Sequence, residues 1–232
     1  LCGTIDTWII WNLTDKKHYT DHTNASRTML YNINDKKWDK ELLEIFDIPK
    51  SILPKIKNSI DNFGNFTLNK LSIPIYGVAG DQQAALFGQG CTKKGNSKCT
   101  YGTGLFYLQN VGNKRLNSKN NLISTIAINN KGKPTYAIEG SVFIGGAVIQ
   151  WIRDELKLIS NVSETENIAN SLNSNDGVYI VPAFAGLGAP YWNSSCNAII
   201  CGLTRGSSKK HIIRAALESI AYQVNDLLDS IK

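Results

Sequence analysis

The chain has few of the residues and motifs on which many enzyme active sites are built. It contains only three histidines in 232 residues, and G-x-S-x-G, H-E-x-x-H and G-x-G-x-x-G do not occur in it. The segment from Gly90 to Ser97 holds the two glycines of a P-loop, but Asn96 stands where that loop needs its lysine. A histidine-centred triad, a zinc protease motif and a dinucleotide-binding fingerprint are therefore not indicated.

Long apolar runs are also missing. The longest candidates, residues 142–149 and 198–203, are interrupted by glycine or cysteine and fall short of the roughly 20 residues that cross a bilayer. With 42% hydrophobic and 19% charged residues, the composition is that of a globular chain with enough apolar material for a core. We expect a soluble protein in the cytoplasm, with no membrane partner.

The cysteine count excludes a complete disulfide framework, because five is an odd number. The spacings between Cys91 and Cys99 and between Cys196 and Cys201 do not match a paired C-x-x-C zinc ribbon. We expect reduced, mostly buried thiols, as is typical of the cytosol. The first residue is Leu1 and a signal peptide is not evident, so we expect the chain to be part of a longer protein.

The net charge of +6 comes from lysines spread along the whole chain. Proteins that bind nucleic acids usually gather arginine and lysine on one face with aromatic residues between them. That pattern is missing here. We therefore predict a solvated lysine surface and no nucleic-acid partner.

The order of the elements predicts an α/β fold. At about 150 residues per domain, the length indicates one large domain or parts of two. The pattern is helix-rich at first, with a mostly buried helix over residues 5–13 and tryptophans as core anchors, and it changes near residue 73 to mixed strands and helices. We expect a buried strand at 73–80, a helix at 81–88, an antiparallel meander over 99–138, helices at 141–158, 163–172 and 209–231, and strands at 178–182 and 198–202.

Gly80-Asp81-Gln82-Gln83 places a carboxylate and two amides at the predicted junction of a strand and a helix. Side chains at such junctions are exposed in a cleft while the backbone is fixed. One interpretation makes Asp81 the N-cap of the helix. The other makes Asp81 a general base and lets Gln82 hydrogen-bond the same substrate. The residues alone leave both interpretations open.

Thr100-Tyr101-Gly102-Thr103-Gly104 lies between two predicted strands. A Gly-Thr-Gly turn can direct backbone N–H groups at an anion, and the threonine hydroxyl adds a donor, as a phosphate-binding hairpin requires. Most such triplets are ordinary hairpin turns. Both readings of this segment stay open as well.

The chain places a carboxylate some twenty residues before a phosphate-type turn. This arrangement resembles that of the superfamily of actin-like ATPases and sugar kinases. More closely, the chain resembles the FGGY family of carbohydrate kinases, and among its members those that phosphorylate glycerol. Five blocks carry this resemblance, in the family's order: Thr23–Leu30, Gly77–Gly88, Thr100–Gly104, Gly186–Trp192 and Gly202–Gln223.

The resemblance implies an α/β, ribonuclease H-like (actin-like ATPase) fold, with parts of two domains flanking a catalytic cleft. Residues 1–80 would be the C-terminal part of the N-terminal, substrate-binding domain. Residues 81–232 would be most of the C-terminal, nucleotide-binding domain. The implied reaction transfers the γ-phosphate of MgATP to glycerol and gives sn-glycerol 3-phosphate and ADP.

The resemblance also assigns roles to particular residues. Asp81 would be the general base, and Asp81, Gln82 and Phe106 would bind glycerol. Thr103, Gly146 and Gln150 would bind the nucleotide. ATP and Mg²⁺ are the implied cofactors. The resemblance assigns no residue of this chain as a metal ligand.

Structural roles are favoured for other conspicuous residues. Arg27 could orient the substrate pocket or pin a loop, and we favour the loop; His211 and Glu218 would tie the last helix to the sheet. Two alternatives to the glycerol-directed activity remain: another carbohydrate kinase of the family, or an actin-like or chaperone-like ATP-driven switch. A homodimer is left open. We expect the isolated chain to be inactive, because the family's first phosphate loop, its glycerol-holding Arg, Glu and Tyr, and its adenine loop lie outside it.

Overall fold

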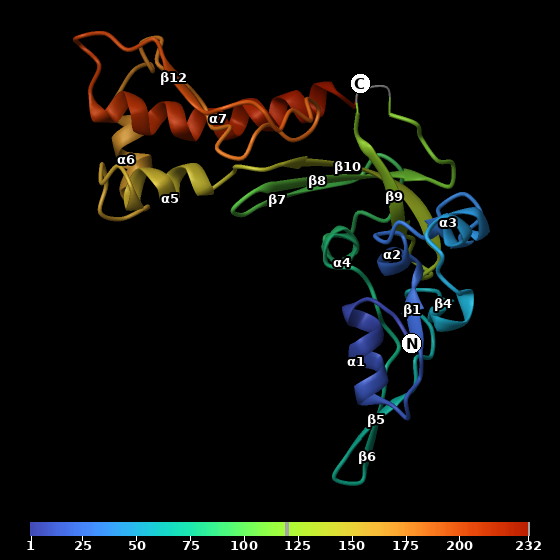
Figure 1. The fold of residues 1–232 in the computed structure, drawn as a ribbon. Helices are drawn as coiled ribbons and strands as arrows, with labels where there is room; N and C mark the ends of the chain where they lie inside the picture. Colours follow the sequence, from blue (N-terminus) through green and yellow to red (C-terminus); the bar gives the residue numbers. More distant parts are fainter. Residues whose placement is uncertain (119–120, 232) are drawn as a thin grey trace. The chain divides into compact units, whose positions relative to one another are not determined.

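The computed structural model describes residues 1–118 and 121–231 (Figure 1). Two compact units form within the chain. The first unit comprises residues 1–98, 108–117 and 124–139. The second comprises residues 99–107, 118–123 and 140–232.

The first unit begins with short helices and paired strands. The strand β1 runs parallel to β4, β2 is antiparallel to β3, and β5 and β6 form an antiparallel hairpin. Its helices are α1 (Ile5–Leu13), α2 (His22–Ala25), α3 (Lys40–Ile45) and α4 (Asp81–Gly88), with a 3₁₀ turn at Lys50–Ile52. Its strands up to α4 are β1 (Tyr19–Asp21), β2 (Tyr31–Asn32), β3 (Lys37–Trp38), β4 (Lys55–Lys57), β5 (Asn65–Leu68) and β6 (Leu71–Pro74).

A four-stranded sheet follows α4, and its strands are β7 (Ser97–Tyr101), β8 (Leu105–Gly112), β9 (Ile123–Ile128) and β10 (Pro134–Val142). The order is β7-β8-β10-β9, so the expected meander is wrong: β10 lies between β8 and β9. A tight turn, in which the N–H of Asn129 donates to the carbonyl of Lys133 at 3.0 Å, joins β9 to β10. The connection from β8 to β9 is longer and does not force those two strands together.

Helices dominate the rest of the second unit: α5 (Ala147–Asp154), α6 (Glu164–Asn170) and α7 (Lys209–Asp229), with the antiparallel strands β11 (Tyr179–Val181) and β12 (Ile199–Cys201). Apolar residues at helical spacing on α5 pack with α7 and β11 into one core. Its fully buried members include Val148, Ile152, Val178 and Ile213. Burying each such side chain contributes about 1.5–3 kcal/mol.

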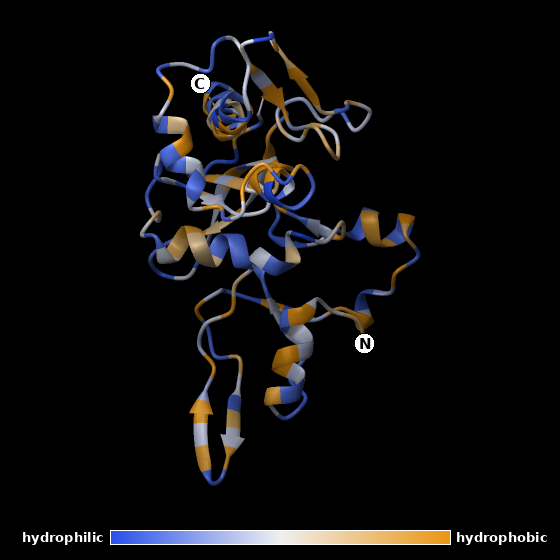
Figure 2. Ribbon diagram, turned by 90° about the vertical axis from the view of Figure 1, so that its left-hand side faces the viewer, coloured by the Kyte–Doolittle hydropathy of each residue, from blue (hydrophilic) through white to orange (hydrophobic). Residues whose placement is uncertain are grey.

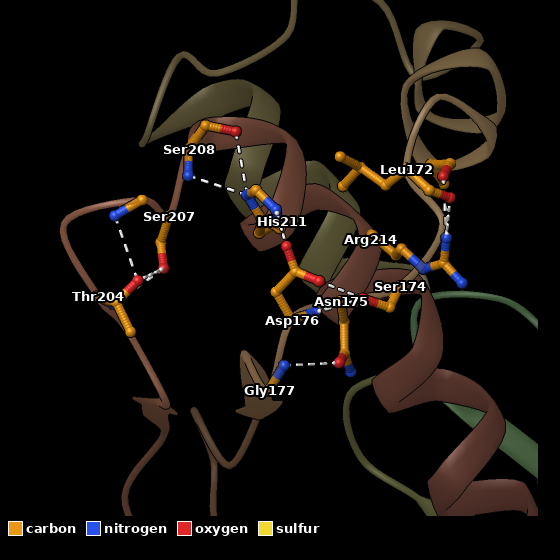
Figure 3. A network of polar contacts seen from close by, with 12 residues as sticks. Leu172, Ser174, Asn175, Asp176, Gly177, Thr204, Ser207, Ser208, His211 and Arg214 are labelled. Carbon is orange, nitrogen blue, oxygen red and sulfur yellow. Dashed lines mark hydrogen bonds and ion pairs between the residues drawn. The ribbon is translucent and has the colours of Figure 1, made fainter.

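The start of α7 is fixed by a polar network (Figure 3). The N–H of Ser208 donates to Nδ1 of His211 at 2.9 Å, so the proton of the imidazole is on Nε2, which donates to Asp176 at 3.1 Å. Hydrogen bonds from Ser174 and then from His211 hold the pKa of Asp176 below its usual value. Arg214 donates to Glu218 at 2.8 Å. Nδ2 of Asn175 also donates to Glu218 at 2.8 Å. His211 and Glu218 thus have structural roles, as expected, but they join α7 to the loop before β11 and not to a strand.

Two elements differ in burial from the prediction. The helix at 5–13 is confirmed, but only Thr7 and Ile10 are buried, and Trp8 is 67% exposed. Apolar residues occur all around α1, which contacts β1 and β5, and most of these apolar residues are exposed. The expected buried strand at 73–80 is wrong: β6 ends at Pro74 and is exposed, and Figure 2 shows orange residues along its projecting hairpin.

The boundaries of one helix and the burial of the cysteines also differ from the prediction. The helix expected from residue 141 begins at Ala147, because β10 continues to Val142. Of the five cysteines only Cys91 is buried, so the expectation of mostly buried thiols is wrong. Among the residues that the structure describes, none of the helices is long and apolar enough to span a membrane.

Arg27 forms an ion pair with a buried carboxylate of the first unit. Its guanidinium donates to both carboxylate oxygens of Glu139, at 2.7 and 3.3 Å. The Glu139 side chain is only 2% exposed, while that of Arg27 is 46% exposed. The expected structural role of Arg27 is confirmed, because this pair ties the segment after α2 to β10.

Replacing Arg27 should destabilise the protein by leaving a buried carboxylate without its partner. We expect Arg27→Met to lower the free energy of unfolding by about 3 kcal/mol, the low end for buried pairs, because water reaches part of Arg27. Urea unfolding measures this, with Arg115→Met as the control. The exposed Arg115 bonds Asn34 and Asn117, and its loss should cost less than about 0.5 kcal/mol. Equal effects of the two substitutions would contradict the prediction.

Candidate functional site

Asp81 is the first residue of α4, and its N-cap is Gly80. The interpretation of Asp81 as the N-cap is therefore wrong. Its Oδ1 accepts a hydrogen bond from the N–H of Gln82 at 2.8 Å, and the side chain is exposed. A carboxylate in the first turn interacts favourably with the helix dipole, by about 0.3–1 kcal/mol. Asp81 is thus an accessible anion on a fixed backbone, and its role as a base stays a prediction.

The side chain of Gln82 lies between Asp81 and a buried lysine. Its Nε2 donates to Oδ2 of Asp81 at 3.3 Å. Its Oε1 accepts a hydrogen bond from Nζ of Lys98, on β7. Lys98 is only 3% exposed. The amide of Gln82 is therefore held at both ends beside the candidate base.

The backbone just before Asp81 is held by a buried polar network. The N–H of Gly80 donates to Oγ1 of Thr23 at 2.8 Å, and that hydroxyl donates to Asp21 at 2.8 Å. Asp21 is fully buried and also accepts hydrogen bonds from Ser59 and Asn24. The position of the first turn of α4 thus depends on residues about sixty positions earlier in the chain.

Gln83, the second amide of the motif, points away from Asp81 into the interior. It is 2% exposed, and its Nε2 donates to Thr125 at 3.4 Å. A Cβ on Gly80 would come within 2.8 Å of Oε1 of Gln83, so a larger residue here would require the buried Gln83 side chain to shift. Gln83 packs α4 against β9 and has a structural role.

The side chains of His22 and Tyr31, near Asp21, stay uncharged. Burial is the main cause that lowers the pKa of His22, and its Nδ1 lies 2.7 Å from the hydroxyl of Tyr31. Burial is also the main cause that raises the pKa of Tyr31. Both side chains are therefore neutral at pH 7, and the hydrogen bonds of Asp21 compensate for its burial.

The hollows of the first unit differ in their chemistry. One of about 270 Å³ lies beside α4 and is lined by Ala79 and Phe87, among others. A larger one of about 620 Å³ at the start of α1 is lined by Trp8, Trp11 and His18 and has no carboxylate in its lining. Size alone therefore does not mark the candidate site.

In the second unit the Gly-Thr-Gly turn packs on the start of α5. The carbonyls of Gly102 and Thr103 accept hydrogen bonds from the N–H groups of Gly146 and Gly145, at 2.8 and 2.7 Å. A Cβ on Gly146 would lie 2.9 Å from the carbonyl oxygen of Gly102. Two of the predicted nucleotide-side residues, Thr103 and Gly146, are thus brought together, and glycine is needed for this contact.

Thr103 has free hydrogen-bonding capacity at the tip of this turn. It is exposed, and within the described ranges neither its hydroxyl nor its amide N–H has a partner. Gln150 is exposed on α5, and Phe106 is partly buried on β8. The predicted site residues thus fall into two groups: Asp81 and Gln82 in the first unit, and the three nucleotide-side residues together with Phe106 in the second.

Sequence reasoning missed Asp21 and Lys98. A signal existed for Asp21, because Asp is a preferred N-cap residue and Asp21 comes just before a predicted helix start; it does cap α2. For Lys98 there is no such signal, because the sequence does not distinguish this buried lysine from the many other lysines of the chain.

Mg²⁺ prefers oxygen ligands, keeps several waters and is usually held by one or two carboxylates together with the phosphates of a nucleotide. Over residues 1–118 and 121–231 there is no cluster of three or more His, Cys, Asp or Glu that could form a cage of its own. The exposed Asp81 carboxylate is compatible with an ion that arrives bound to ATP. Such an ion would neutralise charge on the phosphates.

Comparison with protein families gives two matches that together cover most of the chain. The N-terminal domain of the FGGY family of carbohydrate kinases matches residues 1–88, and its C-terminal domain matches residues 97–232. The predicted division at residue 80 stays a prediction.

Curated relatives with high identity are glycerol kinases. That of Clostridium beijerinckii is 58% identical over 236 residues, covering 100% of this chain and 47% of the relative. That of Clostridium botulinum strain Hall is 59% identical over 235 residues, with the same coverage. The chain thus spans about half the length of the curated relatives it matches.

Solved structures agree with the fold. The crystal structure of Plasmodium falciparum glycerol kinase with ADP has a TM-score of 0.91 and 45% identity, over 99% of this chain and 46% of that one. A ligand-bound xylulose kinase from Lactobacillus acidophilus, 24% identical with a TM-score of 0.82 over 98% of this chain and 47% of its own, shows the same fold. The predicted α/β fold of the actin-like ATPase type is confirmed.

The hydroxyl of Thr23 should be required to hold the backbone at Gly80. In Thr23→Val the buried N–H of Gly80 loses its acceptor, which costs about 1–3 kcal/mol. We expect the amide hydrogen of Gly80 to exchange about ten to a hundred times faster, measured by hydrogen exchange. Thr28→Val removes a local bond to Ala25 and is the control. Unchanged exchange at Gly80 in Thr23→Val would contradict the network.

Proposed function

Because the chain belongs to the FGGY family of carbohydrate kinases, we propose that the protein containing it is a glycerol kinase. It transfers the γ-phosphoryl group of MgATP to a terminal hydroxyl of glycerol, giving sn-glycerol 3-phosphate and ADP. Asp81 accepts the proton of the attacking hydroxyl.

The observation that carries this proposal is the accessible carboxylate of Asp81 at the start of α4, with the Gln82 amide fixed beside it. Phosphoryl transfer needs positioning and charge stabilisation more than covalent chemistry. One carboxylate within reach of a hydroxyl can serve as the base. A chain with three histidines is therefore adequate for this reaction.

The relatives favour glycerol as the acceptor over a five-carbon sugar. The relatives at 58–59% identity are named glycerol kinases, whereas the xylulose kinase above is 24% identical. Gln82 offers an amide to a neighbouring hydroxyl of the same small polyol. Phe106 would pack on the glycerol carbons.

Thr103, Gly146 and Gln150 are proposed for the nucleotide. The unpartnered hydroxyl and N–H of Thr103 can donate to phosphate oxygens, and Gly146 lets the turn approach α5 closely. The ADP in the Plasmodium structure supports a nucleotide as the second substrate.

An ATP-driven switch without kinase activity is the alternative from another class, because fold alone does not determine function. ADP release that depends on glycerol, measured with the full-length protein, separates the two. A cytoplasmic location agrees with the use of ATP. A homodimer, and the lack of nucleic-acid and membrane partners, stay predictions.

Asp81→Asn in the full-length protein should abolish catalysis while leaving the nucleotide bound. Without the base we expect kcat to fall by about 10²–10⁴, with ADP affinity within about threefold of the unaltered protein. A coupled ADP-release assay and calorimetry measure the two quantities. Glu41→Gln, in the first turn of α3 and exposed, is the matched control and should retain activity. Full turnover by Asp81→Asn would remove Asp81 from this role.

Thr103→Val should weaken ATP use specifically. Losing one hydrogen bond to a charged phosphate costs about 1.5–3 kcal/mol, so we expect the KM for ATP to rise at least tenfold. The KM for glycerol should change by less than about twofold. Thr103→Ser keeps the hydroxyl and is expected to stay within about threefold of the unaltered protein. An unchanged KM for ATP in Thr103→Val would exclude the contact.

A further inference from the structure

A buried lysine on β7 deserves explanation, because lysine is almost never fully buried unless it is paired. Lys98 is 3% exposed, and its neighbour Ser97 is exposed, as the alternation of a strand requires. Its ammonium donates to Oε1 of Gln82. A lysine buried with its charge against a candidate substrate-binding side chain points to a role for that contact.

The chemistry of the ammonium fixes which way the Gln82 amide faces. An ammonium has three N–H donors and no acceptor, so only an oxygen can face it. Oε1 must therefore point to Lys98. Nε2 must then point the other way, where it donates to Oδ2 of Asp81 at 3.3 Å.

This orientation leaves one N–H of Gln82 available. Nε2 has two hydrogens, and among the described residues only Asp81 accepts from it. The second N–H can donate to a hydroxyl oxygen placed beside Asp81. Such a hydroxyl, or its neighbour on the same polyol, can in turn donate to the carboxylate.

We propose that Lys98 is a positioning residue, which sets the amide of Gln82 so that its N–H groups face Asp81 and an oxygen of the acceptor polyol. The proposal rests on the proposed function and extends it to a residue that does not touch the substrate. If Lys98 is lost, Oε1 of Gln82 loses its donor, and among the described residues only the 3.3 Å contact of Nε2 with Asp81 still holds the amide. The amide can then turn away from this position, and the donor for the substrate oxygen is no longer fixed.

The expected signature is a change in the KM for glycerol. In the full-length protein, Lys98→Met should raise the KM for glycerol about tenfold, with the KM for ATP within about twofold. Lys98→Arg keeps a donor-only group and should restore the KM for glycerol to within about threefold. Lys93→Met, an exposed lysine in the loop before β7, is the matched control and should behave like the unaltered protein.

A double-mutant cycle tests whether Lys98 acts through Gln82. Gln82→Met removes the amide, so in that background Lys98→Met should change the KM for glycerol by less than about twofold. A further tenfold rise would show that Lys98 acts elsewhere and would overturn the proposal. A rise in the KM for ATP equal to that for glycerol would also overturn it, because a general loss of structure moves both.

Two further outcomes have distinct consequences: a Lys98→Met variant that does not fold, and an unaltered protein that does not phosphorylate glycerol. If Lys98→Met does not fold, Lys98→Gln replaces it: that side chain can offer either an oxygen or an N–H, and an intermediate rise of about threefold is expected, whereas no change would overturn the proposal. If the unaltered full-length protein fails to phosphorylate glycerol, the proposed function itself falls and this inference with it. If the full-length protein phosphorylates glycerol but the effects of Lys98→Met and Gln82→Met on the KM for glycerol are additive, only the proposed role of Lys98 is overturned.

Discussion

The buried carboxylate of Asp21 is the interaction on which the geometry of the first unit depends. A fully buried anion is costly unless hydrogen bonds replace its water. Here it accepts hydrogen bonds from the backbone and side chains of Thr23 and Asn24 and from Ser59. Since each donor must stay in place, the end of β1, the start of α2 and the segment after β4 are fixed together. Thr23 passes the constraint to Gly80, and so to the first turn of α4.

This arrangement separates the residues that hold the site from the residue that would react. Asp21, Gln83 and Lys98 are buried and hydrogen-bonded, whereas Asp81 is exposed. A base has to meet its substrate, so it cannot be held by burying its own carboxylate. The backbone at Gly80 and the amide of Gln82 hold it instead. Buried polar groups of this kind give a single well-defined geometry only when each is satisfied.

What the sequence could predict follows the range of the interactions involved. The pairing of Asp81 with Gln82 and the turn at Thr103 are local, and contiguous motifs indicated both. The contact of Lys98 with Gln82 joins residues sixteen positions apart on different elements, and a lysine-rich composition hides it. The apolar run at 73–80 predicts a buried strand because β-branched residues favour strands. In the structure Ile73 pairs with Phe66 in the exposed hairpin of β5 and β6, and the strand ends at Pro74. The place of β10 between β8 and β9 depends on sheet pairing, which strand patterns alone do not specify.

The same physical argument explains how a chain with so few histidines can hold the proposed base. A carboxylate is a useful base when neighbouring donors fix its position without removing it from water. Gln82 is a neutral donor, so it can orient Asp81 and a substrate oxygen without adding a charge beside either. Its own two ends are alike in shape and opposite in polarity, so packing alone cannot choose between them. The acceptor-only carboxylate of Asp81 at one end and the donor-only ammonium of Lys98 at the other make that choice, and Lys98 is held where solvent cannot compete for it.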